Sequence, residues 1–395
     1  MRWSSAGSDN QALGDAVREC ATKIRGELDD LAPDLAIAFV SAHHSEGYER
    51  VPELVREQIG DCLLIGCSAG GVIGAGSEIE HRPGFAMAAA YLPDVDLVPF
   101  HIEDDELPDG DAGPEEWEKL VGTGAQDSPA FLLVADPFSL RSEQLLMGLD
   151  YAFPRSAKIG GLASGSAQPG GNALYLASEV HHDGAVGIAM RGDITVETVV
   201  AQGCRPIGQP MHVTRCDRNL LLELSGGPPV EVLERVLHEL SDQDRELARH
   251  SLFLGVVMNE LKTDPQLGDF LIRNIVGMDP RSGVLAVGEV LKEGQTVQFH
   301  LRDSATSAQD LDAMLTQYTN THPIYEDAGA LLFQCLGRGS YLYGRADHDT
   351  DMFREKVGNL PLTGFFCNGE IGAVGGSTFL HGYTSSFGIF RPKLG

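Results

Sequence analysis

The sequence predicts an α/β (α+β) protein with two lobes, built from repeated strand, helix, glycine turn and strand units whose mixed sheets are flanked by helices. Three observations predict this fold. With 395 residues, 43% of them hydrophobic, the chain exceeds what one core usually holds. Three segments place the same patterns in the same order. A break rich in glycine and proline, Ser225 to Pro229, separates the two halves.

Each segment is expected to form a strand, a helix, a glycine turn and a second strand. In the first segment these are 36–40, about 48–59, the turn Ile65-Gly-Cys-Ser-Ala-Gly-Gly71, and 85–92. In the second they are 131–135, 142–151, the turn 159–165, and 185–190. In the third they are 330–333, 350–357, the turn 364–369, and 381–390.

The spacing within the three segments is nearly constant. From the first apolar run to the glycine turn it is 30 residues (Ala36 to Gly66), 29 (Phe131 to Gly160) and 33 (Leu331 to Gly364). Chance seldom keeps such a register three times, so we interpret the chain as internally repeated. The alternative is that short strands near helices are common in any α/β protein.

The break after Ser225 is the expected domain boundary. It predicts an N-terminal helix or tail over 1–32, a first domain over 33–224 and a second over 225–395. Apolar positions at helical spacing predict a helix at 230–240. Three later runs, 269–276, 284–290 and 296–301, predict a three-strand meander, and the acidic stretch 101–113 predicts a surface excursion.

Charge excludes two classes of partner. Asp and Glu number 57 against 29 Lys and Arg, and the net charge of −28 repels phosphate backbones and anionic lipid surfaces. Neither a nucleic-acid nor a membrane partner is expected. The seven Cys lack the spacing of a secreted disulfide framework, and no apolar leader or spanning segment is visible, so a cytoplasmic location is expected.

The glycine turns favour a binding site for a small molecule. Backbone amides at such turns could hold a carboxylate, a phosphate or a carbonyl oxygen. The alternative is that the glycines only permit close packing. A nucleotide is disfavoured, because Gly337-Arg-Gly339 lacks the third glycine of a dinucleotide loop and no P-loop sequence occurs.

The C-terminal third closely resembles the signature of FIST domains. The matching stretches are Leu332 to Gly339, Pro361 to Gly372 and Phe379 to Phe390. The turn 65–71 is similar to the family's N-terminal glycine motif, and 270–277 with 297–303 is similar to its central strands. The resemblance covers roughly residues 33 to 390.

This resemblance implies a sensory and signalling module that binds a small ligand, with amino acids and related metabolites among the ligands proposed for the family. The family's modules are often joined to signalling domains or to an F-box, and neither flanks this one. Signalling would therefore use a separate protein. Some family members have been described as haem-binding gas sensors, which keeps a haem cofactor open as an alternative to no cofactor at all.

One polar cluster in the third segment is the first candidate for the ligand site. It combines Cys367, Asn368, Glu370 and His381 with Arg338. If Arg338 and Asn368 face one pocket, they could clamp a carboxylate with charge-assisted hydrogen bonds. The alternative is a salt bridge from Arg338 to Glu370 that only ties a loop.

Three further residues complete the candidate ligand site. Arg273 lies within an apolar strand, where a charge needs a partner, so a structural ion pair explains it equally well. Cys67 and Ser68 lie on a glycine turn. A cysteine-dependent enzyme using Cys67 or Cys367 is the alternative function, but no complete catalytic set is visible, and a buried structural thiol is the more common case.

The histidines do not form a metal motif. In the pairs His43-His44 and His181-His182, adjacent strand residues point to opposite faces, and no Cys-x-x-Cys or His-Glu-x-x-His spacing accompanies them. We expect no metal. A haem would need one axial ligand, which any of these four or His381 could supply. Ligand identity, the signalling partner and a homodimer are left open.

Overall fold

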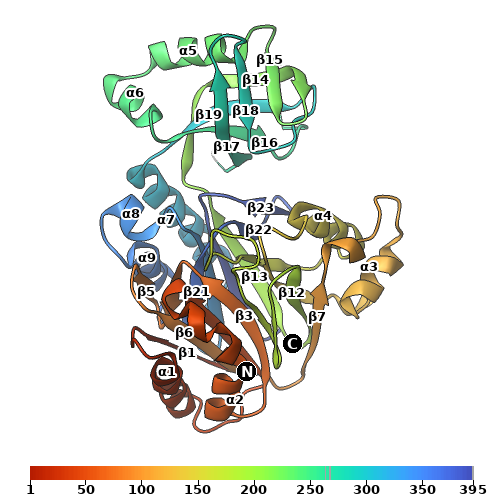
Figure 1. Cartoon of the computed structure of the whole chain (residues 1–395), viewed down its shortest axis with the longest axis vertical. Helices are drawn as coiled ribbons and strands as arrows, with labels where there is room; N and C mark the ends of the chain where they lie inside the picture. The colour runs from red at the N-terminus through yellow and green to blue at the C-terminus, as the bar shows by residue number, and fades with distance from the viewer. Residues whose placement is uncertain (263, 267, 394–395) are drawn as a thin grey trace. The chain divides into compact units, whose positions relative to one another are not determined.

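The computed structural model describes residues 1–262, 264–266 and 268–393 (Figure 1). It confirms a mixed α/β fold in which helices flank mixed sheets. Contacts divide the chain into two compact units. The first contains 1–200, 312–380 and 384–395, and the second contains 201–311 and 381–383.

The first unit is built from three six-stranded sheets with the same central arrangement. A parallel strand pair lies in the middle of each sheet, and an antiparallel strand flanks the first strand of the pair. The pairs are β2 (Leu35–Ser41) with β3 (Leu63–Ala69), β8 (Ala130–Ala135) with β9 (Lys158–Leu162), and β20 (Gly329–Cys335) with β21 (Leu362–Cys367). The flanking strands are β6 (Phe85–Tyr91), β12 (Ala185–Gly192) and β24 (Ser385–Arg391).

Each sheet is completed by a hairpin from a different segment. The hairpin that follows each glycine turn leaves its own sheet and pairs beside the second parallel strand of another sheet. The hairpins are β4 (Gly71–Gly74) and β5 (Ser77–Glu80) beside β21, β10 (Leu174–Leu176) and β11 (Glu179–His181) beside β3, and β22 (Glu370–Val374) and β23 (Ser377–His381) beside β9. The opposite edges are β1 (Arg2–Ser8), β7 (Val95–Ile102) and β13 (Thr195–Ala201). The exchange links the three sheets in a closed cycle.

A glycine in the second strand of each pair permits the close approach of its parallel neighbour. A Cβ at Gly66, Gly160 or Gly364 would lie 1.8 Å from the carbonyl oxygen of Ala38, Leu133 or Leu332, respectively. No side chain fits such a contact without displacing a backbone. These three glycines therefore have a packing role, whatever else their turns do.

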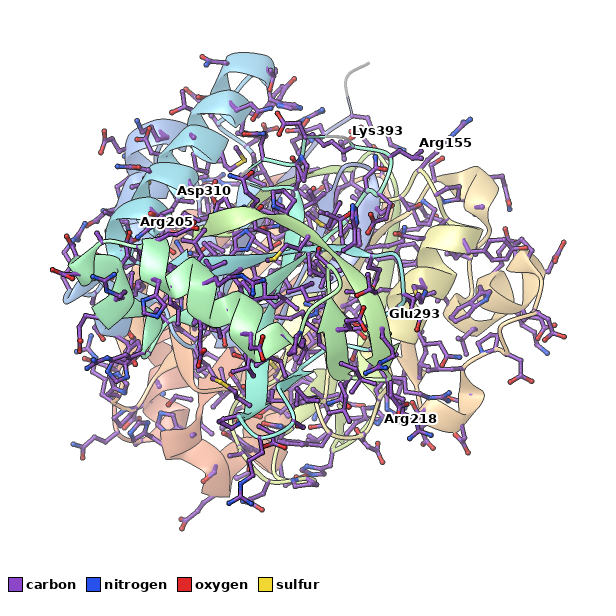
Figure 2. All side chains as sticks on the ribbon, turned by 90° about the horizontal axis from the view of Figure 1, so that it is seen from above. Arg155, Arg205, Arg218, Glu293, Asp310 and Lys393 are labelled. Atoms are coloured by element: carbon purple, nitrogen blue, oxygen red, sulfur yellow. The ribbon has the colours of Figure 1, made fainter. Side chains whose placement is uncertain are left out.

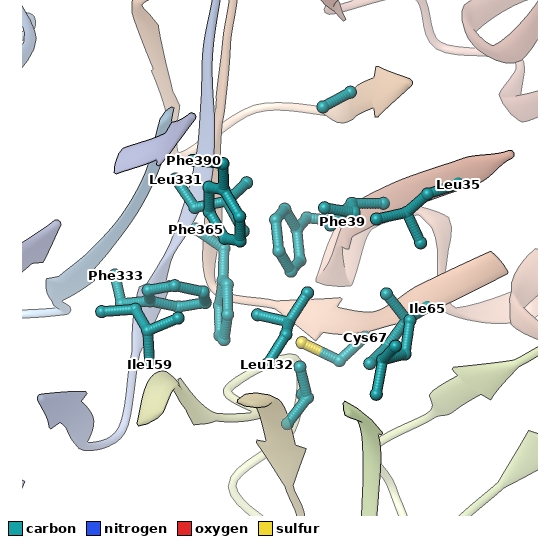
Figure 3. Close-up of a cluster of buried hydrophobic side chains, with 14 of the residues drawn as sticks. Leu35, Phe39, Ile65, Cys67, Leu132, Ile159, Leu331, Phe333, Phe365 and Phe390 are labelled. Carbon is teal, nitrogen blue, oxygen red and sulfur yellow. The ribbon is translucent and has the colours of Figure 1, made fainter. Parts of the chain in front are cut away.

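The three sheets bury their inward faces in one shared core. Figure 3 shows Phe39 from the first sheet against Phe333 and Phe365 from the third, with ring centroids 6.4 and 4.6 Å from that of Phe39. Leu132 and Ile159 join from the second sheet. Each fully buried side chain of this size contributes about 1.5–3 kcal/mol. The outer faces are covered by helices.

These helices include the three expected at about 48–59, 142–151 and 350–357, and two that the sequence did not predict, at 114–121 and 339–343. They are α1 (Leu13–Glu27), η1 (Ala42–Arg50) and α2 (Val51–Ile59) in the first segment, α3 (Pro114–Val121) and α4 (Ser142–Ala152) in the second, and α8 (Gly339–Tyr343) and α9 (His348–Val357) in the third. The short η2 (Asp104–Glu106) and η3 (Ala125–Asp127) precede and follow α3. The predicted run 381–390 is divided, because β23 ends at His381 and β24 begins at Ser385.

The second unit is a closed barrel with two helices. Its strand order is β14 (Cys204–Asp217), β15 (Leu220–Leu224), β18 (Val284–Val287), β17 (Phe270–Asp279), β16 (Leu252–Val257) and β19 (Thr296–Arg302). Its helices are α5 (Pro229–Glu239) and α6 (Asp242–Ala248), and α7 (Ser304–Thr321) follows β19. The predicted three-strand meander is wrong: β17 pairs with β18, but β19 pairs with β14 and β16, because barrel closure leaves no free edge.

The boundaries of the two compact units differ from the domain boundary expected at residue 225. That position lies between β15 and α5, inside the second unit. The reason is that β20 to β24 complete the first unit, so the chain leaves it at residue 201 and returns at 312. Within the expected N-terminal tail, 1–32, the structure adds β1, which pairs with β6.

Two carboxylates of β5 fix the first hairpin to the helices of the third segment. Glu80 accepts from the backbone N of Ser340 at 3.0 Å, and Glu78 accepts from the backbone N of Asp347 at 2.8 Å. Glu78 is buried. That burial, together with the nearby carboxylate of Asp349, raises the pKa of Glu78 to about 8. The side chain of Glu78 is therefore protonated at neutral pH.

We predict that Glu78→Gln stabilises the protein increasingly as the pH rises. The folded-state pKa lies above the value of 4.5 for a free side chain, so the folded chain holds a proton that the unfolded chain releases between about pH 4.5 and about pH 8. Wild-type stability falls across that window. Unfolding in urea from about pH 5.5 to about pH 8 should show the variant gaining about 3 kcal/mol relative to wild type. The exposed Glu57→Gln should gain nothing, and a constant difference for Glu78→Gln would contradict the assignment.

Candidate functional site

The three glycine turns meet one another in the first unit. The backbone N of Ser164 donates to the carbonyl of Ser68 at 3.2 Å, and its hydroxyl accepts from the backbone N of Gly70 at 2.9 Å. The backbone N of Asn368 donates to the carbonyl of Leu162 at 3.1 Å. Polar groups at the three turns therefore form hydrogen bonds with one another.

Arg338 is fixed in a fully buried ion pair. Its Nε donates to Asp349 Oδ2 at 2.7 Å and its Nη2 donates to the hydroxyl of Tyr343 at 2.6 Å. Ser385 also donates to Asp349, at 2.6 Å. Burial opposes the charge on Asp349, but the Arg338 guanidinium outweighs it and holds the pKa of that carboxyl well below its usual range. The sequence leaves open a salt bridge from Arg338 to Glu370 as the alternative to a ligand contact, but no motif in it marks Asp349, the partner that the structure shows.

The neighbours of Arg338 in the predicted cluster face different surroundings. Glu370 is buried, and its Oε2 accepts from the backbone N of Thr384 at 3.1 Å and from its hydroxyl at 2.8 Å. Asn368 is exposed, and its Nδ2 donates to the carbonyl of Ala163 at 3.1 Å. Cys367 lies in the central core.

The remaining candidates are spread over both units. Cys67 lies in the central core, and the Ser68 hydroxyl donates to Asn172 Oδ1 at 3.2 Å. Arg273 and His381 belong to the second unit. Arg273 donates from Nε to Glu289 Oε2 at 2.7 Å, the kind of ion pair that the sequence left open. Ligand contact by the eight predicted residues stays a prediction. The hydrogen bonds and ion pairs described above join parts of the fold to one another.

Four of the pockets in the described parts of the chain stand out, and none of these four is lined by the eight predicted residues or by His43, His44, His181 or His182. These histidines therefore do not fit a haem site in any of these pockets. His181 stacks on His101, with ring centroids 3.9 Å apart, and His182 contacts the carbonyl of Asn172. No group of three His, Cys, Asp or Glu suited to a metal ion occurs among the described residues.

The first pocket has both signs of charge at its rim and a volume of about 180 Å³. Lys23 and Glu27 come from α1 and Arg354 from α9, and each side chain is about half exposed. The floor includes Thr350, which is fully buried and whose hydroxyl has no hydrogen-bond partner within the described residues. An unpaired buried hydroxyl costs about 1–3 kcal/mol unless something satisfies it. No motif in the sequence predicts this pocket, because the residues that line it are far apart along the chain.

A second pocket has the same construction beside the first sheet. Each pocket lies where a helix ends at a glycine, and a hairpin turn from another segment covers the following loop. Gly358 ends α9 and Gly60 ends α2, with φ of 105° and 90°. An arginine precedes each glycine by four residues, Arg354 and Arg56. Arg354 donates to the carbonyl of Gly76 at 2.9 Å, whereas the side chain of Arg56 has no hydrogen bond or ion pair to any described residue.

In the second sheet, Lys158 has the position that corresponds to Leu362 in the first pocket and Leu64 in the second. It pairs across from Phe131, as Leu362 and Leu64 pair across from the matching residues of their sheets. Its buried ammonium donates to the carbonyl of Phe153 and to Asp150 Oδ1, both at 2.8 Å. The three sheets therefore offer two open pockets and one filled position.

The pocket of the second unit surrounds a neutralised cation. Arg205 (Figure 2) donates from Nε to Asp303 Oδ2 at 3.0 Å and also pairs with Asp244. Both carboxylates line the pocket. An anionic guest here would have to compete with both carboxylates for the guanidinium.

Comparison with protein families matches almost the whole chain. A model of the FIST N domain matches residues 34–227, and a model of the FIST C domain matches residues 229–373. No helix in the described residues is long and apolar enough to cross a membrane.

Similar proteins occur in mycobacteria and in a plant. Uncharacterized protein Rv0628c of Mycobacterium tuberculosis is 35% identical over 95% of this chain and 96% of its own length. Uncharacterized protein Mb0898c of Mycobacterium bovis is 36% identical over 96% of each chain. The F-box/LRR-repeat protein At5g63520 of Arabidopsis thaliana is 23% identical over 72% of this chain and 61% of its own. The crystal structure of cyanuric acid hydrolase from A. caulinodans covers 100% of both chains at 8% identity, but its TM-score of 0.36 is too low to carry an argument.

We predict that neither Cys67 nor Cys367 reacts with iodoacetamide in the native protein near neutral pH. Full burial raises the pKa of both thiols well above the ordinary value, and only the thiolate is nucleophilic. Peptide mapping after alkylation should find any label on the partly exposed Cys62, Cys216 and Cys335. Denatured protein, in which every cysteine is accessible, is the positive control. Rapid labelling of Cys67 or Cys367 in the native protein would contradict the prediction and favour the cysteine-dependent enzyme.

We predict that Arg338→Met lowers the free energy of unfolding by about 3–5 kcal/mol, because it leaves the buried carboxylate of Asp349 without its cation. Removing both charges in Arg338→Met with Asp349→Leu should recover part of the loss. Arg345→Met, which breaks the exposed pair with Asp351, should cost less than about 1 kcal/mol. Equal effects of Arg338→Met and Arg345→Met in denaturant titrations would contradict this.

Proposed function

The chain belongs to the FIST family, whose domains are associated with small-ligand sensing, and from that premise we propose that it binds a small zwitterion of the amino-acid class in the pocket between α1 and α9. Binding without turnover, followed by a change in affinity for a separate signalling protein, would be its role. The observation that carries the proposal is the unpaired, fully buried hydroxyl of Thr350 at the floor of a pocket whose rim carries both signs of charge.

The charges suit the two ends of an amino acid. Lys23 lies 3.8 Å from Glu27, and Arg354 pairs with Asp351 at 3.1 Å. Both half-exposed cations would share their donors with the carboxylate of the guest. Such charge-assisted hydrogen bonds are about twice as strong as neutral ones. Glu27 offers an acceptor for an ammonium group, while Ser4 donates to its Oε2 at 2.7 Å. The Thr350 hydroxyl would bond a polar atom of the guest. The volume of about 180 Å³ lies below the ~300–1,000 Å³ of pockets for drug-sized ligands, so the guest must be small.

The pocket also lies where a ligand can influence the fold. Its walls come from the first segment, through α1 and the β4–β5 turn, and from the third, through α9 and the 358–362 loop. A guest that contacts both walls would tighten the joint between them. Such differential contact is what a ligand needs to shift a conformational equilibrium.

A thermal-shift screen of the protein amino acids tests the proposal. A ligand that binds only the folded chain raises its melting temperature by mass action, by an amount that grows with concentration above Kd. We predict that at least one amino acid stabilises the protein saturably and that Thr350→Val removes most of this effect. The substitution should leave the unliganded protein as stable as wild type or more so, because it deletes an unpaired buried hydroxyl.

Charge variants separate the two ends of the ligand. Lys23→Gln should weaken an amino acid and the matching carboxylic acid without an amino group alike, whereas Glu27→Gln should weaken only the amino acid. Lys292→Gln, at an exposed position in the second unit, is the matched control. Stabilisation that survives both Thr350→Val and Lys23→Gln would place the ligand elsewhere, and no stabilisation by any amino acid would overturn the ligand class.

A further inference from the structure

A second surface of the first unit has a character unlike the ligand pocket. It is a groove of about 560 Å³ beside α4. Its apolar lining comes from Pro137, Leu140, Met147, Leu162 and Leu380, and its polar lining includes Arg141, Ser142 and Gln144. The groove is separate from the proposed ligand site, because the two share no lining residue.

Large apolar side chains are exposed on α4 and just before it, and one of them, Met147, lines the groove. Met147 and Tyr151 of α4 have 72% and 59% of their surface exposed, and Phe138, just before the helix, has 44%. Met147 and Tyr151 are four residues apart and therefore share one face of the helix. The opposite face of α4 is used for the core, through residues such as Leu145 and Leu149. Exposed large apolar side chains that gather on one face of a helix are typical of a site of interaction.

An acidic segment borders the same groove. Residues 103–118 contain nine Asp or Glu and no Lys or Arg. The segment reaches the groove through two contacts: the backbone N of Arg141 donates to Asp104 Oδ1 at 2.8 Å, and Gln144 Nε2 donates to the carbonyl of Pro108 at 3.3 Å. Most of the other carboxylates in the segment are exposed, and Figure 1 shows α3 and α4 side by side.

The groove also contains an unsatisfied polar group. The Ser142 side chain lines it, is 6% exposed, and its hydroxyl has no hydrogen-bond partner in the described parts of the chain. A buried hydroxyl without a partner is costly, so a guest that supplied a polar atom there would gain from it. This observation is independent of the apolar and acidic surfaces and points to an occupant.

We propose that the groove docks a cationic amphipathic helix of a partner protein. The apolar face of such a helix would cover Met147, Tyr151 and Phe138, and its Lys or Arg residues would meet the acidic segment. A second copy of this chain fits less well, because it would bring another net charge of −28 against the same acids. An anionic lipid surface is repelled for the same reason. This proposal does not depend on the ligand pocket.

The test uses the full chain and a model peptide with Leu and Lys at helical spacing, carrying a fluorescent label. We predict saturable binding by fluorescence anisotropy with one peptide per chain, weakened at least tenfold by Met147→Ser with Tyr151→Ser. The same peptide with Glu in place of Lys should not bind. Raising the salt concentration should weaken binding, because the acidic segment is exposed and its charges are screened.

Matched controls separate docking at the groove from general attraction to an acidic protein. Tyr341→Ser, which removes a tyrosine 83% exposed on α8, should leave the affinity unchanged. Neutralising four acids of the segment, Asp105, Asp109, Asp111 and Glu115, should weaken binding several-fold more than neutralising four exposed acids of α5 and α6, Glu231, Glu234, Glu239 and Glu246.

Three outcomes would overturn the proposal. The first is a Kd unchanged by the paired Met147 and Tyr151 substitutions. The second is an equal loss for both sets of neutralised acids, which would indicate attraction to net charge alone. The third is a dimer in sedimentation experiments that dissociates in the Met147 and Tyr151 variant, which would assign the surface to a second copy.

Discussion

The exchange of hairpins among three sheets is the constraint on which the first unit depends. Backbone hydrogen bonds from each glycine-bearing strand are completed by a hairpin that belongs to another segment. No segment can therefore finish its sheet alone, and the shared aromatic core forms only when all three are present. The close strand approach at Gly66, Gly160 and Gly364 serves this arrangement, because it lets each parallel pair come together at the place where the chain turns away.

The same exchange creates the pockets. A hairpin turn that lies over the end of another segment's helix leaves a small space bounded by two parts of the chain. The three positions have matching strand pairing but different side chains. The first contains Thr350, the second contains Arg56, whose side chain has no partner among the described residues, and the third is filled by Lys158. Repetition of a backbone thus provides several sites, and single residues decide which of them can accept a guest.

The periodic patterns of the sequence predicted most central strands and covering helices, because these bury continuous apolar faces. They could not predict the strand pairing, since partners such as Val72 and Phe365 are far apart along the chain. Nor did they identify β1, whose sequence holds serines that are buried and hydrogen-bonded to distant groups. The partner of Arg338 was missed for the same reason: Asp349 follows a helix start that looks like any exposed one, and only the tertiary structure buries it.

The insertion of the barrel between residues 201 and 311 has a consequence for how the chain is made. During synthesis the β4–β5 hairpin leaves the ribosome long before its partner strand β21 exists, whereas β10 and β11 follow β3 within about a hundred residues. The barrel can close on local contacts while the first unit waits for the last strands. A high contact order of this kind slows folding and leaves unpaired strand edges exposed to aggregation. The nascent chain therefore needs protection on two edges, those of β4 and β9, until their partners β21 and β22 arrive within the final hundred residues.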